Sequence, residues 1–227
     1  MTWVKICATT NLADAQASLA AGADALGFIF APSSRQIAID QAAEIISSLT
    51  DEIEKIGVFV NEAPAKIAEL AERAGLTGVQ LHGDELAGQM REYHRAIGHR
   101  KLVKTLQARE LLSSPGSLDG YLRSRQSIDA ILLDAGSPSQ RGGTGETFDW
   151  TAAVPIVARI KVCLPVIIAG GLNSDNVAEA IRLFQPWGVD VVSGVESEIG
   201  KKDKSKLRSF VTAVREGSLV ANSGGSD

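Results

Sequence analysis

Residues 165–184 read PVIIAGGLNSDNVAEAIRLF, and this stretch combines a strand, a turn and a helix in succession. Residues 166–169 form an apolar run without polar alternation, which is typical of a strand buried on both faces in a parallel sheet. Two glycines follow, and from about Ser174 apolar residues recur at helical spacing. The stretch therefore predicts one strand–helix unit of a parallel sheet, with a glycine turn between the two elements.

The same unit recurs along the chain. Short apolar runs are each followed by a helical pattern at a mean spacing of about 28 residues, enough for a strand, a crossover helix and loops. The eight predicted strands cover residues 4–7, 25–30, 55–60, 78–82, 102–106, 130–134, 166–169 and 189–193. They predict one α/β domain, a parallel eight-stranded (β/α)8 TIM barrel over residues 1–217, followed by a disordered tail over residues 218–227.

Capping residues mark several helix boundaries. Asn11 suits a helix N-cap, Gly22 suits the end of the same helix, and Pro64 suits a first helical turn. The helical pattern is weakest at residues 113–126, SSPGSLDGYLRSRQ. An open, doubly wound sheet is the alternative fold, but residues 5–11, KICATTN, lack the G-x-G-x-x-G turn often found after its first strand.

The composition is that of an ordinary water-soluble domain. Of the 227 residues 44% are hydrophobic, and the net charge of −4 gives no electrostatic reason to expect nucleic acid or an anionic membrane as partner. No apolar stretch is long enough to span a membrane, and none has the pattern of a secretory signal. We therefore expect a cytoplasmic protein that is either a monomer or a homodimer.

The chain has two cysteines, Cys7 and Cys163, and a reducing cytoplasm would keep both as free thiols. Neither C-x-x-C nor H-x-x-x-H spacing occurs, so no metal site is predicted. Taken alone, Cys7 at the end of the first strand is more typical of packing than of chemistry. Cys163, just before the seventh strand, is interpreted as structural.

Polar and reactive residues collect at the carboxyl ends of the predicted strands, where barrel enzymes have their active sites. Asp134 ends the apolar run AILLDA, where loss of solvation favours a neutral carboxyl group that suits a general acid. Capping of the next turn is the alternative role for Asp134. His82 suits either a catalytic base or a hydrogen bond to the loop. The strand-end residues are Cys7, Arg35, Asn61, Gln80, His82, Asp84, Gln107 and Asp134.

Glycine turns end the last two strands. Gly170-Gly171 precedes a helix, and Ser193-Gly194 follows the final strand. Backbone N–H groups of such turns approach anions closely, and the loops after these two strands often form a phosphate site in barrels. The alternative is a pair of tight turns that need positive φ and bind nothing.

A third glycine-rich segment, SQRGGTGETFDW (139–150), follows the sixth strand. Its loop, residues 136–147, is interpreted as a lid over the site, with a flexible surface loop as the alternative. It is not a P-loop, because the G-K-[ST] ending is absent. The candidate substrate contacts outside the phosphate turns are Gln80, His82, Gly143 and Gly145.

In combination these segments resemble the phosphoribosylanthranilate isomerase family. The resemblance covers about residues 4–210 and implies a TIM barrel that acts on a phosphosugar, N-(5-phosphoribosyl)anthranilate. The family rearranges this aminoaldose to 1-(2-carboxyphenylamino)-1-deoxyribulose 5-phosphate in L-tryptophan biosynthesis, an Amadori reaction without cofactor or metal. The blocks that carry the resemblance are VKIC (4–7), GVFVN (57–61), VQLHGDE (79–85), GGTGETFDW (142–150), IIAGGLN (167–173) and GVDVVSGVE (188–196).

The resemblance also implies roles for individual residues. Cys7 would be the general base and Asp134 the general acid, while Arg35 would pair with the anthranilate carboxylate. The two glycine turns would hold the phosphate. A thiol with an ordinary pKa of about 8.5 suits a base when a positive field lowers that value, and a guanidinium suits a planar carboxylate through bidentate bonds.

The sequence departs from the family pattern at two places, next to Cys7 and around Arg35. Ala8 follows Cys7 where the family usually has glycine, and SSRQI (33–37) replaces SPRYV around Arg35. A related histidine-pathway aminoaldose isomerase would carry a carboxylate where this chain has Cys7. A barrel that binds a phosphorylated metabolite as a regulator, without catalysis, is disfavoured by the presence of both Cys7 and Asp134.

Overall fold

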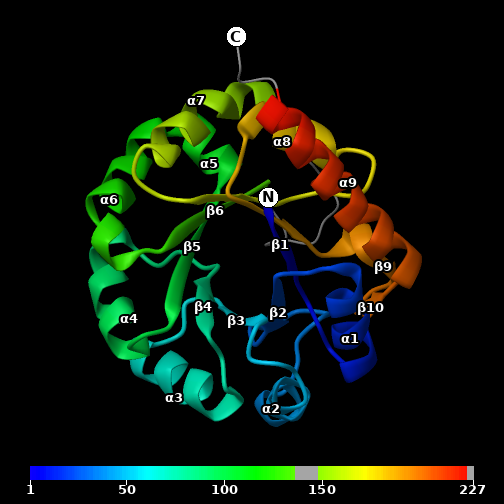
Figure 1. Ribbon diagram of the computed structural model, residues 1–227. Coiled ribbons are helices and arrows are strands. Elements are labelled where there is room, and N and C mark those ends of the chain that lie inside the picture. The colour runs from blue at the N-terminus through cyan, green and yellow to red at the C-terminus, as the bar shows by residue number, and fades with distance from the viewer. Residues whose placement is uncertain (136–147, 224–227) are drawn as a thin grey trace.

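Parallel strands close into a barrel in which each strand pairs with the next along the chain and the last pairs with the first (Figure 1). The computed structural model describes residues 1–135 and 148–223. The barrel strands are β1 (Trp3–Ile6), β2 (Ala25–Ile29), β3 (Glu54–Phe59), β4 (Gly78–Leu81), β5 (Lys101–Gln107), β6 (Ala130–Asp134), β7 (Val166–Ile168) and β8 (Gly188–Val191). The predicted TIM barrel is confirmed, and the doubly wound alternative is excluded.

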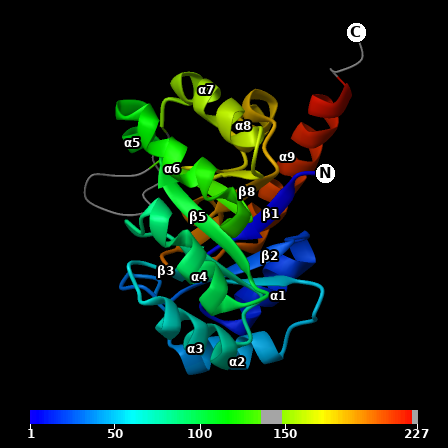
Figure 2. The same cartoon turned by 90° about the vertical axis from the view of Figure 1, so that its left-hand side faces the viewer.

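Helices surround the barrel on its outer face (Figures 1 and 2). After β8 the chain forms a small antiparallel pair, β9 (Glu196–Glu198) and β10 (Lys201–Lys202), before the last helix packs beside α8 and α1. The helices are α1 (Leu12–Ala21), α2 (Ile39–Ser47), α3 (Pro64–Ala74), α4 (Met90–Ile97), α5 (Ala108–Ser113), α6 (Leu118–Arg123), α7 (Trp150–Lys161), α8 (Val177–Phe184) and α9 (Lys204–Ser223).

Both faces of the strands are buried, which explains their near-continuous apolar sequences. The larger apolar layer lies between the strands and the helices. A smaller one fills the barrel interior, where Trp3 packs against a cluster of Val103, Ala130, Leu132, Ile167 and Ala169. Charged residues also lie inside the barrel toward the carboxyl ends of the strands, and they belong to the site described below.

The predicted helix boundaries hold where a cap was identified. The Asn11 side chain accepts a hydrogen bond from the Asp14 backbone N–H at 2.9 Å, and Gly22 ends α1 with φ 96°. Pro64 is the first residue of α3. The weak pattern at residues 113–126 corresponds to a broken helix, in which a 3-10 turn at Pro115–Ser117 separates α5 from α6.

Two boundaries differ from the sequence-based expectation. The helix α8 begins at Val177 rather than near Ser174, because the Asn176 side chain accepts the Asn173 N–H and holds residues 174–176 in a turn. The helix α9 continues past residue 217 to Ser223, where the sequence suggested a tail. One anchor of this extension is Ser218, which is buried and hydrogen-bonded to Thr2 at 2.7 Å.

In the two described ranges of the chain, no helix is both long and apolar enough to cross a membrane. The loop 136–147, interpreted above as a lid, and residues 224–227 lie outside the described residues.

Candidate active site

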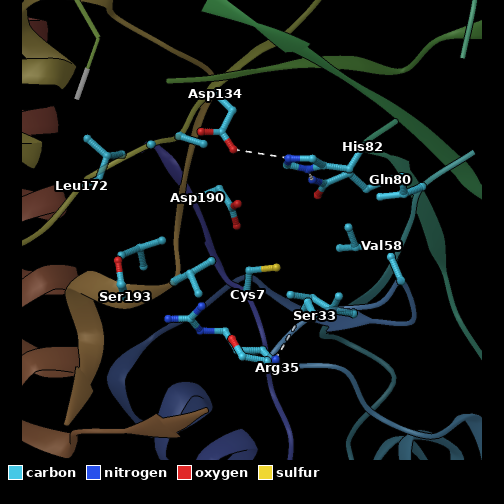
Figure 3. Close-up of a pocket in the computed structure, with 18 of the residues that line it drawn as sticks. Cys7, Ser33, Arg35, Val58, Gln80, His82, Asp134, Leu172, Asp190 and Ser193 are labelled. Carbon is cyan, nitrogen blue, oxygen red and sulfur yellow. Dashed lines mark hydrogen bonds and ion pairs between the residues drawn. The ribbon is translucent and has the colours of Figure 1, made fainter. Parts of the chain in front are cut away.

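A cavity of about 590 Å³ opens at the carboxyl ends of the barrel strands. Its wall comes from residues at or just after the ends of β1, β2, β3, β4, β6, β7 and β8, so distant parts of the chain meet there (Figure 3). This is the end at which barrel enzymes bind their substrates. The predicted site residues that line the cavity are Cys7, Arg35, Gln80, His82, Asp134, Gly170, Gly171 and Ser193.

Three predicted site residues have a different status. Gly194 is not among the residues that line the cavity, and a Cβ atom at this position would lie 2.0 Å from the Leu172 carbonyl oxygen. Its role in the structure is to let two backbone turns approach each other. Gly143 and Gly145 lie outside the described residues.

Cys7 follows β1 and is 3% exposed, with its thiol directed into the cavity (Figure 3). Burial raises the pKa of the Cys7 thiol above its ordinary value, although the nearby cations of Lys5 and Lys202 act to lower it. The positive field expected from the sequence is therefore present, but desolvation of the buried thiol outweighs it. A thiolate at Cys7 would depend on these two lysines for its stabilisation.

Lys5 and Asp190 form an ion pair inside the barrel, with Nζ 2.8 Å from Oδ1. Burial alone would lower the pKa of Lys5, but the Asp190 carboxylate and Cys7 raise it above its ordinary value, so Lys5 stays cationic. Gly27 on the neighbouring strand β2 leaves room for the thiol, since a Cβ there would lie 2.5 Å from the Cys7 Sγ. The barrel strands thus supply both the charged groups beside Cys7 and the space that its thiol occupies.

Ala8 adopts φ 63°, in the left-handed region that favours glycine. Its side chain is fully buried. The backbone on either side is held by hydrogen bonds, from the Cys7 N–H to the Val191 carbonyl at 2.9 Å and from the Thr9 N–H to the Gly27 carbonyl at 2.8 Å. The alanine therefore takes up the conformation for which glycine would be the usual choice.

Asp134 ends β6 and lies 3.4 Å from His82, measured from Oδ2 to Nε2 (Figure 3). The Gln80 amide nitrogen lies 2.9 Å from His82 Nδ1 and 3.1 Å from the Thr105 hydroxyl. Because an amide nitrogen only donates, Nδ1 accepts and neutral His82 carries its proton on Nε2, facing Asp134. The residues of β4 and β5 thus orient the imidazole ring beside the carboxyl group.

Arg35, which follows β2, contacts Glu196, the first residue of β9. Its Nε and Nη2 donate to the two carboxylate oxygens at 2.9 and 2.7 Å. Lys202 Nζ lies 3.4 Å from the same carboxylate, and its side chain is completely buried. Burial acts to raise the pKa of Glu196, but the hydrogen bonds from Arg35 and the charge of Lys202 hold it below its ordinary value.

The two turns after β7 and β8 meet at one side of the cavity. Gly170 and Gly171 have φ of 86° and 65°, as the tight-turn interpretation required. The Asn176 side chain donates to the Gly171 carbonyl at 2.9 Å and fixes this turn before α8. Ser193 begins a 3-10 turn, Ser193–Val195, on the adjacent strand end. The arrangement is suited to an anion, because two turns and a helix N-terminus converge.

Four charged residues of this site were not identified from the sequence: Lys5, Asp190, Glu196 and Lys202. The signal for Lys5 and Asp190 is a charge within an otherwise apolar strand, in VKIC and in GVDVV. Glu196 ends the block GVDVVSGVE (188–196), whose recognisable feature is the Ser193-Gly194 turn, and Lys202 follows six residues later. Among the described residues, no group of three or more His, Cys, Asp or Glu side chains could hold a metal ion.

Known proteins are similar to this chain in both sequence and fold. The family model described as N-(5'phosphoribosyl)anthranilate (PRA) isomerase matches residues 4–213. The N-(5'-phosphoribosyl)anthranilate isomerase of Pelobacter propionicus is 44% identical, covering 94% of this chain and 95% of its own. That of Geotalea uraniireducens is 45% identical, covering 93% and 97%.

Solved structures agree with the sequence relatives. Phosphoribosyl anthranilate isomerase from Thermotoga maritima superposes with a TM-score of 0.82 at 37% identity, covering 95% of this chain and 100% of its own. A structure of phosphoribosyl anthranilate isomerase in complex with reduced 1-(o-carboxyphenylamino)-1-deoxyribulose 5-phosphate gives a TM-score of 0.79 at 36% identity, with the same coverage. With a family match over nearly its whole length, the chain belongs to the N-(5'-phosphoribosyl)anthranilate isomerase family.

Proposed function

We propose that this isomerase of tryptophan biosynthesis carries out an Amadori rearrangement by general acid and base catalysis. The substrate is N-(5-phosphoribosyl)anthranilate and the product 1-(2-carboxyphenylamino)-1-deoxyribulose 5-phosphate. The observation that carries this proposal is that Cys7 and Asp134, from β1 and β6, line one cavity together with Arg35 and the two glycine turns. The product-analogue complex of a relative supports the same ligand class.

The proposed reaction begins at Asp134. Its protonated carboxyl group gives a proton to the ring oxygen of the ribose, the bond between C1 and this oxygen breaks, and the nitrogen lone pair forms an iminium at C1. The His82 Nε2 lies 3.4 Å from the carboxyl group, close enough to interact with the carboxylate that remains after the transfer. No external reactant is required, because the electrons that form the iminium come from the substrate nitrogen.

The second step belongs to Cys7. The iminium acidifies the proton on C2, and the Cys7 thiolate removes it to give an enol-amine, which tautomerises to the ketone as C1 gains a proton. Formation of the thiolate is opposed by burial and assisted by Lys5 and Lys202. A cationic iminium beside Cys7 adds a further positive charge, so the bound intermediate itself favours the thiolate.

The two ends of the substrate have separate proposed sites. The turns at Gly170-Gly171 and at Ser193 bind the phosphate, and Arg35 binds the anthranilate carboxylate. Gln80 and His82 contact the sugar, since both line the same cavity as Cys7 and Asp134. We also propose a monomer or a homodimer in the cytoplasm. Free thiols at Cys7 and Cys163 are consistent with a reducing compartment, and a dimeric relative from Thermotoga maritima is known.

Complementation of a tryptophan auxotroph that lacks this isomerase tests the proposal. The wild type should restore growth, whereas Cys7→Ser and Asp134→Asn should not, because each removes a proton-transfer group. Turnover of the fluorescent substrate by purified protein, without added cofactor, gives an independent rate. No growth with the wild type would refute the function, and full growth with Asp134→Asn would refute the acid assignment alone.

A further inference from the structure

Glu196 occupies one edge of the Arg35 guanidinium and leaves another edge open. Nε lies 2.9 and 3.1 Å from the two carboxylate oxygens, and Nη2 lies 2.7 Å from the second. Within the described residues Nη1 takes part in no hydrogen bond. A guanidinium can bind two carboxylates at once because its donors project along separate edges. The bond to Glu196 therefore leaves Arg35 able to receive a second carboxylate.

Glu196 is itself firmly held. Its side chain is 4% exposed, against 13% for that of Arg35. Lys202 lies 3.4 Å from the carboxylate, and the Gly200 N–H donates to it at 3.3 Å. Arg35, by contrast, lies in a turn after β2, where its backbone N–H donates to the Ser33 hydroxyl. The anchored carboxylate thus fixes the end of a long side chain that starts from a loop.

We propose that Glu196 is a positioning residue, which clamps Arg35 by its Nε–Nη2 edge so that the open edge is presented to a carboxylate on the ligand. The inference rests on the proposed function and deepens it, because it identifies what selects an arylamine bearing an ortho carboxylate. Pre-orientation lowers the entropy cost of binding, since the guanidinium is already ordered before the ligand arrives. Without Glu196 the Arg35 side chain would be free to swing away from the cavity.

Two probes that differ only in the carboxylate test this proposal. One is reduced 1-(o-carboxyphenylamino)-1-deoxyribulose 5-phosphate, and the other is the corresponding compound made from aniline. Glu196→Gln should weaken binding of the first by about tenfold or more, as expected when one partner of a buried charge pair is removed. Binding of the second should stay within about twofold of the wild type, because that compound makes no use of Arg35.

Matched variants separate positioning from folding. Glu198→Gln removes an exposed carboxylate of the same strand, paired with Lys201 at the surface, and should leave both affinities unchanged. Glu196→Gln leaves the buried Lys202 without this carboxylate. The double variant Glu196→Gln/Lys202→Met restores the charge balance and should show the same selective loss of affinity for the carboxylate probe. Arg35→Met should lose the same affinity, and adding Glu196→Gln to it should cost nothing more.

The outcomes distinguish this inference from the proposed function. Equal weakening of both probes, or tighter binding of the carboxylate probe by Glu196→Gln, would overturn the positioning role while wild-type turnover still supports the isomerase. If the wild type binds neither probe and turns over no substrate, the proposed function fails and the inference fails with it.

Discussion

Lys5 Nζ lies 2.8 Å from Asp190 Oδ1 across the junction of β1 and β8, and this buried pair borders the Cys7 thiol. The lysine acts to lower the pKa of the thiol, whereas the carboxylate acts to raise it. Burial also raises this pKa and has the largest effect of the three. Besides burial and Lys202, the ionisation of the proposed base therefore depends on two residues that the proposed chemistry does not otherwise use.

Lys5→Met should raise the pKa of Cys7 further, because it removes a cation and leaves Asp190 unbalanced. The thiolate form gains population as the pH rises through the thiol pKa, so a higher pKa moves the reactive range to higher pH. The rate of alkylation of Cys7 by iodoacetamide, measured against pH in a Cys163→Ser background, reports this shift. The background is needed because Cys163 is exposed.

The matched control for this experiment is Lys66→Met, which removes an exposed lysine and should leave the alkylation profile unchanged. Breaking the buried pair should also cost about 3–5 kcal/mol of stability. The double variant Lys5→Met/Asp190→Leu should recover much of that cost and show a smaller shift, since the carboxylate is gone as well. An identical profile for wild type and Lys5→Met would contradict the assigned role.

The barrel could be predicted from the sequence because its signal is local. Each strand buries both faces and several helices begin or end at a recognisable cap, so most strand–helix units can be identified within about 28 residues. Cys7 and Asp134 could be placed at one end of the barrel because parallel strands share their direction. The role proposed for Cys7 rests on the family resemblance, whereas the position of Asp134 at the end of an apolar run also favoured a general acid.

The ion pairs of the site could not be predicted because they join residues that are far apart in the chain. Lys5 and Asp190 are separated by 185 residues, and Arg35 and Glu196 by 161. Only closure of the barrel between β1 and β8 brings the first pair together. The direction in which the pKa of the Cys7 thiol shifts could not be predicted either, because it depends on burial in the folded barrel, which no local sequence pattern reveals.

Ala8→Gly should change the free energy of unfolding by less than about 1 kcal/mol, because opposing effects nearly cancel. Left-handed backbone costs a non-glycine residue roughly 1–2 kcal/mol. Glycine would instead lose roughly 0.5–1 kcal/mol through chain entropy and about 0.8 kcal/mol for a buried methyl group. Urea denaturation measures the difference. Ala8→Val is the contrasting variant and should destabilise by at least about 2 kcal/mol, because a β-branched residue at φ 63° is both strained and overpacked.

Gly27→Ala should reduce activity far more than stability. The new Cβ would lie 2.5 Å from the Cys7 Sγ and 3.0 Å from its Cα, so the thiol must move. Overpacking of this kind costs about 1–3 kcal/mol, whereas displacing a reacting group by an ångström costs about 100-fold in rate. Steady-state kinetics and thermal denaturation measure the two effects. The control is Gly116→Ala, whose Cβ would have nothing within 4 Å and which should change neither the activity nor the stability. Unaltered turnover by Gly27→Ala would show that the position of the Cys7 thiol is not critical.

Glu85→Gln should be strongly destabilising, because Glu85 belongs to another buried ion pair, close in sequence to His82. Lys104 Nζ lies 2.6 Å from its carboxylate, and both side chains are 1% exposed. The carboxylate also accepts the backbone N–H groups of Asn61 and Gly83, at 2.8 and 3.0 Å. Removing one partner of such a pair costs about 3–5 kcal/mol, measurable by urea denaturation.

The surface pair of Lys66 with Glu69 provides the comparison for Glu85→Gln. Both of its side chains are about half exposed, at 47% and 59%, so Glu69→Gln should change stability by no more than about 0.5 kcal/mol. Replacing both buried charges, in Glu85→Leu/Lys104→Met, should cost less than Glu85→Gln alone, because no unpaired charge is left in the protein interior. A loss below about 1 kcal/mol for Glu85→Gln would mean that water reaches Lys104 once the Glu85 carboxylate is gone.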